Sequence, residues 1–358
     1  MEQERYHRQT ILDKFGQENQ LKLKRAKVLV IGAGGLGCPV LQYLAAMGVG
    51  VIGIADDDHI ALSNLHRQVL YSTSDVGKLK VSQAAMRLKE MNPEIEIISH
   101  HLRLNSNNIL GILTPYDFIF DGTDNFETRY LINDCCALLK KPLVFAAVSA
   151  YEGQLAIFNT PDENGLATNY RDLFPIAPKP GEIANCEENG VLGVLPGIIG
   201  SMAAAEIVKL ITGIGKPLIN KLLHYNLLTN EQYVLHINKG IDYQLPKTEN
   251  EILQTADSFV EINIEQLTAL KLQSSTLLVD VRETHELPLL NTSDFKKAPM
   301  SSFEDFLDSD IAAKDIVLIC QHGIRSQAAA EALHEKYGAA KNIFSLKGGI
   351  VKWKNYFS

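Results

Sequence analysis

One stretch decides the fold of this 358-residue chain: Val28-Leu29-Val30-Ile31-Gly32-Ala33-Gly34-Gly35-Leu36-Gly37. Its four apolar residues predict a strand, and Leu36, Val40, Leu44 and Met47 then follow at helical spacing. Glycines between a strand and a helix allow the backbone to approach a phosphate at the helix N-terminus. The stretch therefore predicts a nucleotide site, and taken alone it suits NAD, FAD or ATP equally.

Strand and helix signals alternate beyond this stretch. The predicted strands are Val51–Ala55, Ile95–Ile98, Phe118–Phe120 and Leu143–Ala147, and the predicted helices are Lys78–Met91 and Asn125–Lys140. This order predicts a Rossmann-like α/β fold, a doubly wound and mostly parallel sheet that binds ligands at the carboxyl ends of its strands. From Gln154 the pattern changes to shorter strands and one apolar helix, Ile198–Ile211.

A second, smaller α/β unit is predicted from Phe259 onward. In it the segment Cys320-Gln321-His322-Gly323-Ile324-Arg325-Ser326 follows the predicted strand Ile316–Ile319 and precedes a predicted helix. This spacing predicts a tight loop with a thiol at its start, inward backbone N–H groups and a guanidinium at its end. Such a loop stabilises an anionic sulfur.

Length and composition indicate two globular domains, at roughly 150 residues each. We assign residues 1–240 to the nucleotide-binding domain, 241–257 to a polar linker and 258–358 to the second domain. The net charge is −8 and no Lys/Arg-rich run occurs, which argues against a nucleic-acid partner. The first residues are polar, no apolar run reaches about 18 residues, and the five cysteines lack disulfide spacing. We therefore expect a cytoplasmic protein without a membrane segment.

Polar side chains are expected at the carboxyl edge of the larger sheet. Asp56 ends the second strand, where a carboxylate can bind ribose hydroxyls. Arg67 and Lys80 follow, and the segment Asp121–Asn125 comes at the end of a later strand. Cationic side chains neutralise a triphosphate and an aspartate can hold Mg²⁺, so this set suits nucleotidyl transfer better than hydride transfer.

With these residues the chain resembles the MoeB/ThiF adenylyltransferases, relatives of ubiquitin-activating enzymes, from Arg5 to about residue 240. The matching motifs are Arg5-Tyr6-His7-Arg8-Gln9, residues 32–38, Ser63-Asn64-Leu65-His66-Arg67-Gln68, Gly77-Lys78-Leu79-Lys80, Thr123-Asp124-Asn125, Glu152-Gly153-Gln154 and residues 190–197. The family uses ATP to adenylate the C-terminal glycine of a ubiquitin-like sulfur carrier that ends in Gly-Gly.

The resemblance implies a role for each matched residue. Asp124, with Asn125, would hold Mg²⁺ and the reacting centre, and Arg8 would enter the site of the partner subunit of a homodimer. The implied ATP-binding residues are Gly34, Asp56, Ser63, Asn64, Leu65, His66, Arg67, Lys80, Asp124 and Asn125.

This chain differs from the family in its zinc-binding cysteines but keeps a cysteine that corresponds to the family's carrier-binding thiol. Its structural zinc is usually held by two Cys-x-x-Cys pairs, but this chain has residues 169–172 (Asn-Tyr-Arg-Asp) and 241–244 (Ile-Asp-Tyr-Gln) at those places. Since zinc needs three or four S or N ligands, we predict no zinc and expect packing to hold that corner. Cys186 lies where the family has a thiol that can bind the carrier covalently, and we expect the same role here.

Residues 258–358 resemble a rhodanese domain. The resemblance lies in Val279-Asp280-Val281-Arg282-Glu283, the Cys320 loop, residues 346–350 and Trp353, and it fails between residues 285 and 303. It implies that Cys320 carries a persulfide and that Arg325 stabilises its charge. The Cys320 loop has four residues between Cys and Arg, one fewer than tyrosine-phosphatase loops, which suits a persulfide better than a phosphate.

The sequence thus predicts an enzyme that adenylates a sulfur carrier and then converts it into a thiocarboxylate. The carrier, the pathway (molybdopterin, thiamine or tRNA thiolation) and the sulfur donor (a cysteine desulfurase or thiosulfate) remain open. One alternative is an NAD-dependent oxidoreductase with a regulatory rhodanese module, and another is a non-catalytic binding protein.

Overall fold

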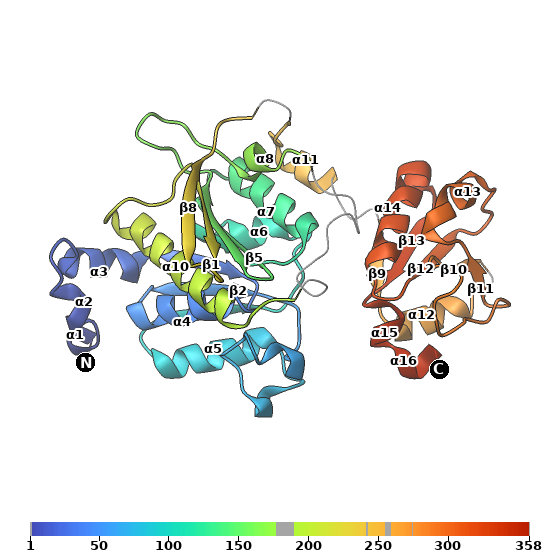
Figure 1. The fold of residues 1–358 in the computed structure, drawn as a ribbon, viewed down its shortest axis with the longest axis horizontal. Helices are drawn as coiled ribbons and strands as arrows, with labels where there is room; N and C mark the ends of the chain where they lie inside the picture. Colours follow the sequence, from blue (N-terminus) through green and yellow to red (C-terminus); the bar gives the residue numbers. More distant parts are fainter. Residues whose placement is uncertain (1, 177–189, 241–242, 255–258, 274, 358) are drawn as a thin grey trace. The chain divides into compact units, whose positions relative to one another are not determined.

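The computed structural model describes the whole chain except residues 1, 177–189, 241–242, 255–258, 274 and 358 (Figure 1). The chain divides into two compact units, a larger one that contains α1 to α11 and a smaller one that contains β9 to α16. Each unit is built around a sheet of its own, and each is described separately below.

The larger unit holds an eight-stranded sheet in the order β3-β2-β1-β4-β5-β6-β7-β8. Strands β1 to β5 are parallel, and β6 to β8 add antiparallel strands at one side. The predicted doubly wound, mostly parallel sheet is therefore confirmed. The strands are β1 (Lys27–Ile31), β2 (Val51–Ala55), β3 (Glu96–His100), β4 (Phe118–Asp121), β5 (Leu143–Ser149), β6 (Glu152–Phe158), β7 (Lys221–Asn226) and β8 (Glu231–His236).

Helices cover both faces of this sheet because its central strands are apolar on both sides. Val28 and Val30 of β1 pack into one core together with Leu44, whereas Leu29 and Ile31 pack into the opposite core. The helices are α1 (Glu2–Arg5), α2 (His7–Thr10), α3 (Gly16–Arg25), α4 (Gly37–Met47), α5 (Lys80–Met91), α6 (Ile109–Leu113), α7 (Phe126–Leu138), α8 (Tyr170–Leu173), α10 (Val194–Thr212) and α11 (Glu249–Gln254).

Among the described residues, α10 is the one helix long and apolar enough to cross a membrane by length and composition. It packs against α4, β5 and β6. Its Glu206 is buried, accepts a hydrogen bond from the backbone N–H of Leu218 at 2.8 Å and pairs with Lys209. These contacts are those of a core helix.

Two of the departures from the predicted helices concern α5 and α11. Helix α5 begins at Lys80 rather than Lys78, because Leu79 is extended and forms a β-bridge with His59. Helix α11 lies within the stretch assigned to the linker, and its Ile252 is 1% exposed in the core that also contains Cys135 of α7.

The smaller unit is a five-stranded parallel sheet in the order β11-β10-β12-β13-β9. The strands are β9 (Val260–Ile262), β10 (Thr276–Asp280), β11 (Phe295–Lys297), β12 (Asp315–Ile319) and β13 (Asn342–Leu346). The helices are α12 (Ile264–Lys271), α13 (Phe303–Asp308), α14 (Ile324–Tyr337), α15 (Gly349–Lys352) and α16 (Lys354–Phe357). Leu318 and Ile319 of β12 lie in opposite cores, so this sheet too is covered on both faces.

Candidate active sites

The glycine loop after β1 lies where the strand order reverses, between β1 and β4. Gly32 has φ +90°, and a Cβ on it would lie 3.0 Å from the carbonyl oxygen of Gly122. A Cβ on Gly37 would lie 1.8 Å from the carbonyl oxygen of Gly32. Only glycine fits these two positions, and the open crevice at a strand-order reversal is where such sheets bind nucleotides.

Asp56 holds the glycine loop in place. Its Oδ2 accepts a hydrogen bond from the backbone N–H of Ala33 at 2.8 Å, and its Oδ1 accepts one from the N–H of Asp58 at 2.8 Å. Burial raises the pKa of the Asp56 carboxyl, against the opposing effect of nearby Lys80. Each oxygen keeps a second lone pair that can accept a ribose hydroxyl, so the predicted ribose role fits the geometry.

Lys80 is a buried cation among carboxylates. Its side chain is 7% exposed, and its Nζ lies 3.0 Å from Oδ2 of Asp58. Burial lowers the pKa of Lys80, but Asp56, Asp58 and Asp124 outweigh that effect and the net pKa is raised. The structure therefore brings Asp56, Lys80 and Asp124 into one electrostatic group, and Lys80 stays charged at neutral pH.

The segment between β2 and α5 places Arg67 beside the glycine loop. A Cβ on Gly35 would lie 3.4 Å from Cγ of Arg67. Nη1 of Arg67 donates to the carbonyl oxygen of Ser63 at 3.1 Å and lies 2.7 Å from Nε2 of His66. Asn64 accepts from the N–H of Ala61 at 3.1 Å, which shapes this turn. The remaining predicted residue, Leu65, packs against the core.

The end of β4 carries the predicted metal ligand. Asp124 and Asn125 are both exposed, and Oδ1 of Asn125 caps α7 by accepting from the N–H of Thr128 at 2.8 Å. Mg²⁺ is commonly bound by one or two carboxylates together with substrate phosphates. A single exposed aspartate beside a buried lysine fits that arrangement, although the role of Asp124 remains a prediction.

Sequence reasoning missed the residues that position this loop. Asp121 is fully buried, its Oδ1 accepts from both N–H and Oγ1 of Thr123 at 2.9 and 2.6 Å, and Arg129 lies 3.7 Å from its Oδ2. Nη2 of Arg129 donates to the carbonyl oxygen of Thr123 at 2.6 Å. Complete burial raises the pKa of Asp121, opposed by Arg129. An arginine within a helix, such as Arg129, could not be recognised from the sequence as the partner of a buried aspartate.

Gln68, the last residue of the Ser63–Gln68 motif, lies beside the glycine loop. It is 3% exposed, and its Nε2 would lie 3.6 Å from a Cβ on Gly34. Its Oε1 has no hydrogen-bond partner in the described part of the chain. A buried amide oxygen beside the glycine loop is an acceptor that a bound nucleotide can use.

Arg8 does not join this group within one chain. The Arg8 side chain is exposed on α2, and the neighbouring Tyr6 packs against Gly48 just after α4 and bonds to Asn92 after α5. Gly48 is at the opposite end of α4 from the glycine loop, a distance of about 15 Å along a helix of this length. The predicted role of Arg8 therefore depends on a second protomer and stays a prediction.

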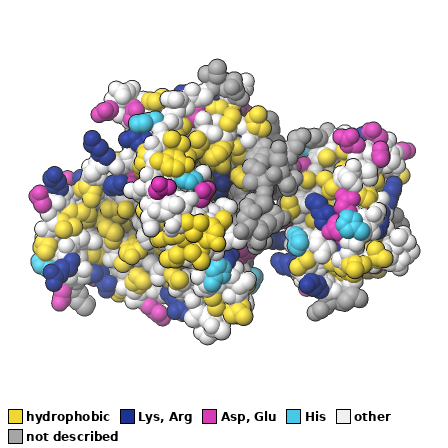
Figure 2. Space-filling model, viewed as in Figure 1, with side chains coloured by type: hydrophobic (Ala, Val, Ile, Leu, Met, Phe, Trp, Pro, Cys, Tyr) yellow, Lys and Arg dark blue, Asp and Glu magenta, His cyan; other side chains and the backbone are white. Residues whose placement is uncertain are grey.

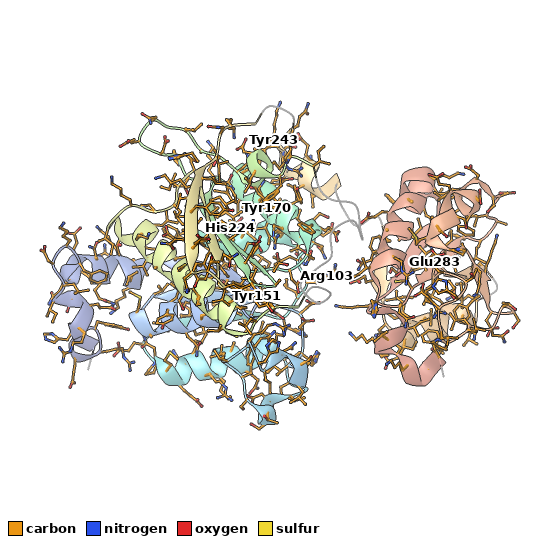
Figure 3. The ribbon with its side chains drawn as sticks, viewed as in Figure 1. Arg103, Tyr151, Tyr170, His224, Tyr243 and Glu283 are labelled. Carbon is orange, nitrogen blue, oxygen red and sulfur yellow. The ribbon has the colours of Figure 1, made fainter. Side chains whose placement is uncertain are left out.

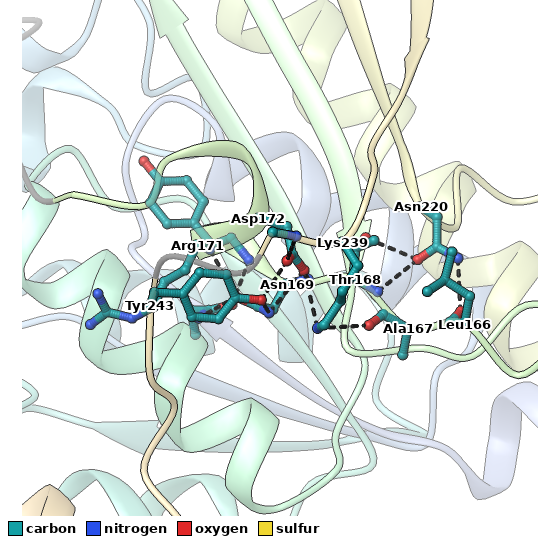
Figure 4. Close-up of polar contacts among 12 residues, drawn as sticks. Leu166, Ala167, Thr168, Asn169, Arg171, Asp172, Asn220, Lys239 and Tyr243 are labelled. Atoms are coloured by element: carbon teal, nitrogen blue, oxygen red, sulfur yellow. Dashed lines mark hydrogen bonds and ion pairs between the residues drawn. The ribbon is translucent and has the colours of Figure 1, made fainter.

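The corner where zinc was considered is joined by hydrogen bonds (Figure 4). Oδ1 of Asp172 accepts from Tyr243 Oη and from the N–H of Gly240 at 2.6 Å. Its Oδ2 accepts from the N–H and the Nδ2 of Asn169 at 2.7 and 2.9 Å and from Nζ of Lys239 at 3.2 Å. We call this group the Asp172 cluster. Apolar packing is present at this corner as expected, with Tyr170 1% exposed in the core. The buried carboxylate of Asp172 links the two segments in addition.

Two predictions about thiols and metals stay open. Cys186 lies outside the described residues. Within the described ranges, no group of three or more His, Cys, Asp or Glu side chains is arranged to hold a metal ion. The absence of zinc remains a prediction.

The Cys320 loop has the predicted form. Cys320 is 1% exposed, and its Sγ accepts from the N–H of Gly323 at 3.0 Å and lies 3.4 Å from Oγ of Ser326. Gly323 adopts φ +95°, and a Cβ on it would lie 2.9 Å from the backbone nitrogen of Gly348. The N–H of Gly323 is thereby turned toward the sulfur, an arrangement that stabilises an anion. Ser345 of β13 donates to Ser326 at 2.9 Å.

Arg325 lies at the end of this loop but has a partner that was not predicted. Its Nη1 and Nη2 lie 2.6 and 2.7 Å from the two carboxylate oxygens of Glu286, a bidentate ion pair. That pairing raises the pKa of Arg325 and lowers the pKa of Glu286 to about 2. Glu286 belongs to the stretch where the rhodanese resemblance fails.

Comparison with known proteins follows the same division of the chain. Residues 6–242 match the ThiF family and residues 263–356 match the rhodanese-like domain. A Mycobacterium tuberculosis protein named probable adenylyltransferase/sulfurtransferase MoeZ is 38% identical over 362 residues, covering 98% of this chain and 92% of the relative. A Thermus thermophilus sulfur carrier protein adenylyltransferase is 53% identical over 228 residues, covering 63% of this chain and 84% of the relative.

Solved structures agree on the fold of the larger unit. Escherichia coli MccB with ATP has a TM-score of 0.52 and 24% identity, over 63% of this chain and 68% of that chain. The fold, the two loops and the full-length relatives define an adenylyltransferase with an attached sulfurtransferase domain. The chain belongs to the ThiF family and also carries a rhodanese-like domain. The predicted family and fold class are confirmed, and the relatives favour this function over the oxidoreductase alternative.

Proposed function

We propose that the larger unit uses ATP and Mg²⁺ to adenylate the C-terminal glycine of a ubiquitin-like sulfur carrier that ends in Gly-Gly. The observation that carries this proposal is the charged group of Lys80, Asp56 and Asp124 beside the glycine loop. The names of the relatives, which include a sulfur carrier protein adenylyltransferase, support the carrier as substrate.

Each side chain has a part in the first step. The carrier carboxylate attacks the α-phosphorus of ATP, the bond to the bridging oxygen breaks, and pyrophosphate leaves. Lys80 and Arg67 offset the negative charge that builds on the phosphates. Asp56 orients the ribose, and Asp121 and Arg129 fix the loop that presents Asp124. Asp124 would hold Mg²⁺, which when bound would neutralise negative charge on the triphosphate. The product, an acyl-adenylate, has an acyl carbon that a sulfur nucleophile can attack.

The smaller unit supplies that nucleophile. The terminal sulfur of a persulfide on Cys320 attacks the acyl carbon, AMP leaves, and an acyl disulfide forms. A second thiol then attacks the Cys320 sulfur, becomes oxidised to a disulfide, and releases the carrier thiocarboxylate. Cys186 is our candidate for that thiol. The N–H of Gly323, the hydroxyl of Ser326 and the Arg325 guanidinium support anionic sulfur at Cys320.

The first step is tested by exchange of labelled pyrophosphate into ATP, with a purified Gly-Gly-ended carrier as substrate. We expect exchange with the wild-type chain, loss on Lys80→Met or Asp124→Ala, and retention on Lys78→Met. Lys78 is the matched control because it is a half-exposed lysine two positions away that pairs with Asp75. Carrier-dependent exchange that survives Lys80→Met unchanged would refute the proposed site. NADH binding without exchange would revive the oxidoreductase alternative.

The second step is tested by the intact mass of the carrier after incubation with ATP and a sulfur donor. Replacement of one oxygen atom by one sulfur atom is expected with the wild type and not with Cys320→Ala. Pyrophosphate exchange should be unaffected by Cys320→Ala, which separates the two steps.

We also propose a homodimer, in which Arg8 completes the partner's site, and a cytoplasmic location. Mixing an Arg8→Ala chain with a Lys80→Met chain should restore partial activity if the sites are shared.

A further inference from the structure

The guanidinium of Arg325 is neutralised by a single carboxylate. Both of its Nη atoms bond to Glu286, and the two side chains are 32% and 20% exposed, so the pair lies at the surface of the Cys320 loop. Glu286 is itself fixed, because its Oε1 accepts from the N–H of Glu283 at 2.8 Å. The positive charge that ends the loop is therefore largely offset toward an approaching small anion, while it still acts on the Cys320 sulfur.

Arg282, whose Nη1 donates to Oε1 of Gln321 in the loop at 3.3 Å, is paired with a carboxylate as well. The neighbouring cation, Arg282, is 1% exposed and bonded to Asp280 through Nε and Nη2 at 2.9 Å each. Glu283 adds a second carboxylate, which accepts from Ser301 Oγ at 2.8 Å. Figure 2 shows acidic, basic and histidine side chains side by side on the face of the smaller unit where Figure 3 labels Glu283.

The same segment presents apolar side chains to solvent. Leu287 and Leu289, which flank Pro288 just after Glu286, are 71% and 66% exposed. Two exposed leucines that follow Glu286, the partner of Arg325, offer contact area to a protein but nothing to an inorganic anion. The paired charge of Arg325 and the exposed leucines thus both favour a protein over an inorganic anion as the sulfur donor.

We propose that Glu286 is a specificity-determining residue that directs Cys320 to a persulfide carried on a protein cysteine and away from thiosulfate. This inference rests on the proposed role of Cys320. In the favoured reaction the Cys320 thiolate attacks the terminal sulfur of the donor persulfide, the donor S–S bond breaks, and the donor cysteine leaves as a thiolate. With thiosulfate the same attack would release sulfite, but the dianion must first approach a site whose cation is already paired.

The test compares two donors on the full chain. Persulfide formation on Cys320 is followed by intact mass, with thiosulfate in one arm and a cysteine desulfurase loaded with cysteine in the other. Glu286→Gln should raise kcat/KM for thiosulfate about tenfold, mostly through a lower KM, because one charge at short range has an effect of that order. It should change the rate with the protein donor less than about twofold, the scale of a weak surface charge effect.

A matched control is Asp294→Asn. Asp294 also forms an ion pair, with Lys271 at 2.9 Å, but it precedes β11 at the amino end of the parallel strands, whereas the Cys320 loop follows β12 at their carboxyl end. This variant should leave both donors unchanged. An unchanged or lower thiosulfate kcat/KM in Glu286→Gln would overturn the proposal, because it would mean that Glu286 only positions Arg325.

A second variant tests the proposed protein contact separately, in case Glu286→Gln folds poorly. The double change Leu287→Ser and Leu289→Ser should slow transfer from the protein donor about tenfold, as loss of a small apolar contact does, and leave thiosulfate unchanged. Equal effects on both donors, or none, would contradict the proposed protein contact. Cys320→Ser must lose both reactions; if it retained them, the proposed sulfur site itself would be wrong, independently of Glu286.

Discussion

Replacement of Asp172 by alanine should destabilise the larger unit more than most single substitutions. The Asp172 side chain is fully buried and accepts hydrogen bonds from Asn169, Lys239, Gly240 and Tyr243. The substitution would remove the acceptor for the N–H of Gly240 and the hydroxyl of Tyr243. It would also remove the Asp172 half of the α8 capping box, while the Asn169 side chain would still cap the N–H of Arg171. It would leave Lys239, whose side chain is 47% exposed, free to turn to solvent.

The magnitude follows from these contacts. A buried polar group left without its partner costs about 1–3 kcal/mol, and loss of one half of a capping box adds at most about 1 kcal/mol. Partial relaxation and water entry reduce the sum, so we expect a loss of about 3–5 kcal/mol in the free energy of unfolding. Tyr243→Phe removes one donor and should cost about 1 kcal/mol. Glu163→Ala, an exposed acidic residue, should change stability by less than about 0.5 kcal/mol.

Chemical denaturation of the full chain measures this loss. Trp353, the one tryptophan of the chain, lies in the smaller unit, so its fluorescence follows that unit while far-UV circular dichroism follows both. Asp172→Ala should shift the circular dichroism transition of the larger unit and leave the tryptophan transition unchanged. A chelator should shift neither in the wild type. A loss below about 1 kcal/mol would show that the Asp172 cluster is dispensable, and a chelator effect would show that metal holds the corner.

Three further outcomes are expected. Lys80→Met should lower kcat/KM for adenylation by about 10²–10³, the usual effect of losing one charge-stabilising donor, as measured by pyrophosphate exchange. Arg282→Met should destabilise the smaller unit by about 3–5 kcal/mol in the tryptophan transition, because it leaves the buried carboxylate of Asp280 unpaired. The pKa of Glu286 is lowered from 4.5 to about 2, so its ion pair stabilises the fold above pH 4.5 and this contribution is lost as pH falls toward 2. Acid titration of the tryptophan signal should show that loss in the wild type, and Glu286→Gln should reduce it.

The sequence predicted those parts of the structure that depend on local pattern. The strand Val51–Ala55 was predicted at its observed bounds, because a short apolar run between polar turns fixes a central strand. Gly32 and Gly37 were recognised because their spacing reflects a backbone requirement within a few residues. The Cys320 loop was predicted for the same reason.

Contacts between distant segments could not be predicted. Glu286 and Arg325 are 39 positions apart, and Asp172 and Tyr243 are 71 apart. The missing cysteines at residues 169–172 spoke against zinc but did not reveal the carboxylate that joins the two segments. Such pairs form because the tertiary fold brings distant segments together. The local spacing of hydrophobic residues contains no information about these contacts.

Helix α11 sets where the two halves of the chain can be separated for recombinant production. Because Ile252 is 1% exposed, a fragment that stops at residue 240 would lack this side chain and uncover the apolar surface beneath it. Uncovered apolar surface promotes self-association, so that fragment should precipitate or form mixed oligomers. A fragment that stops after Gln254 retains its natural cover and is the better material for isolating the adenylating half.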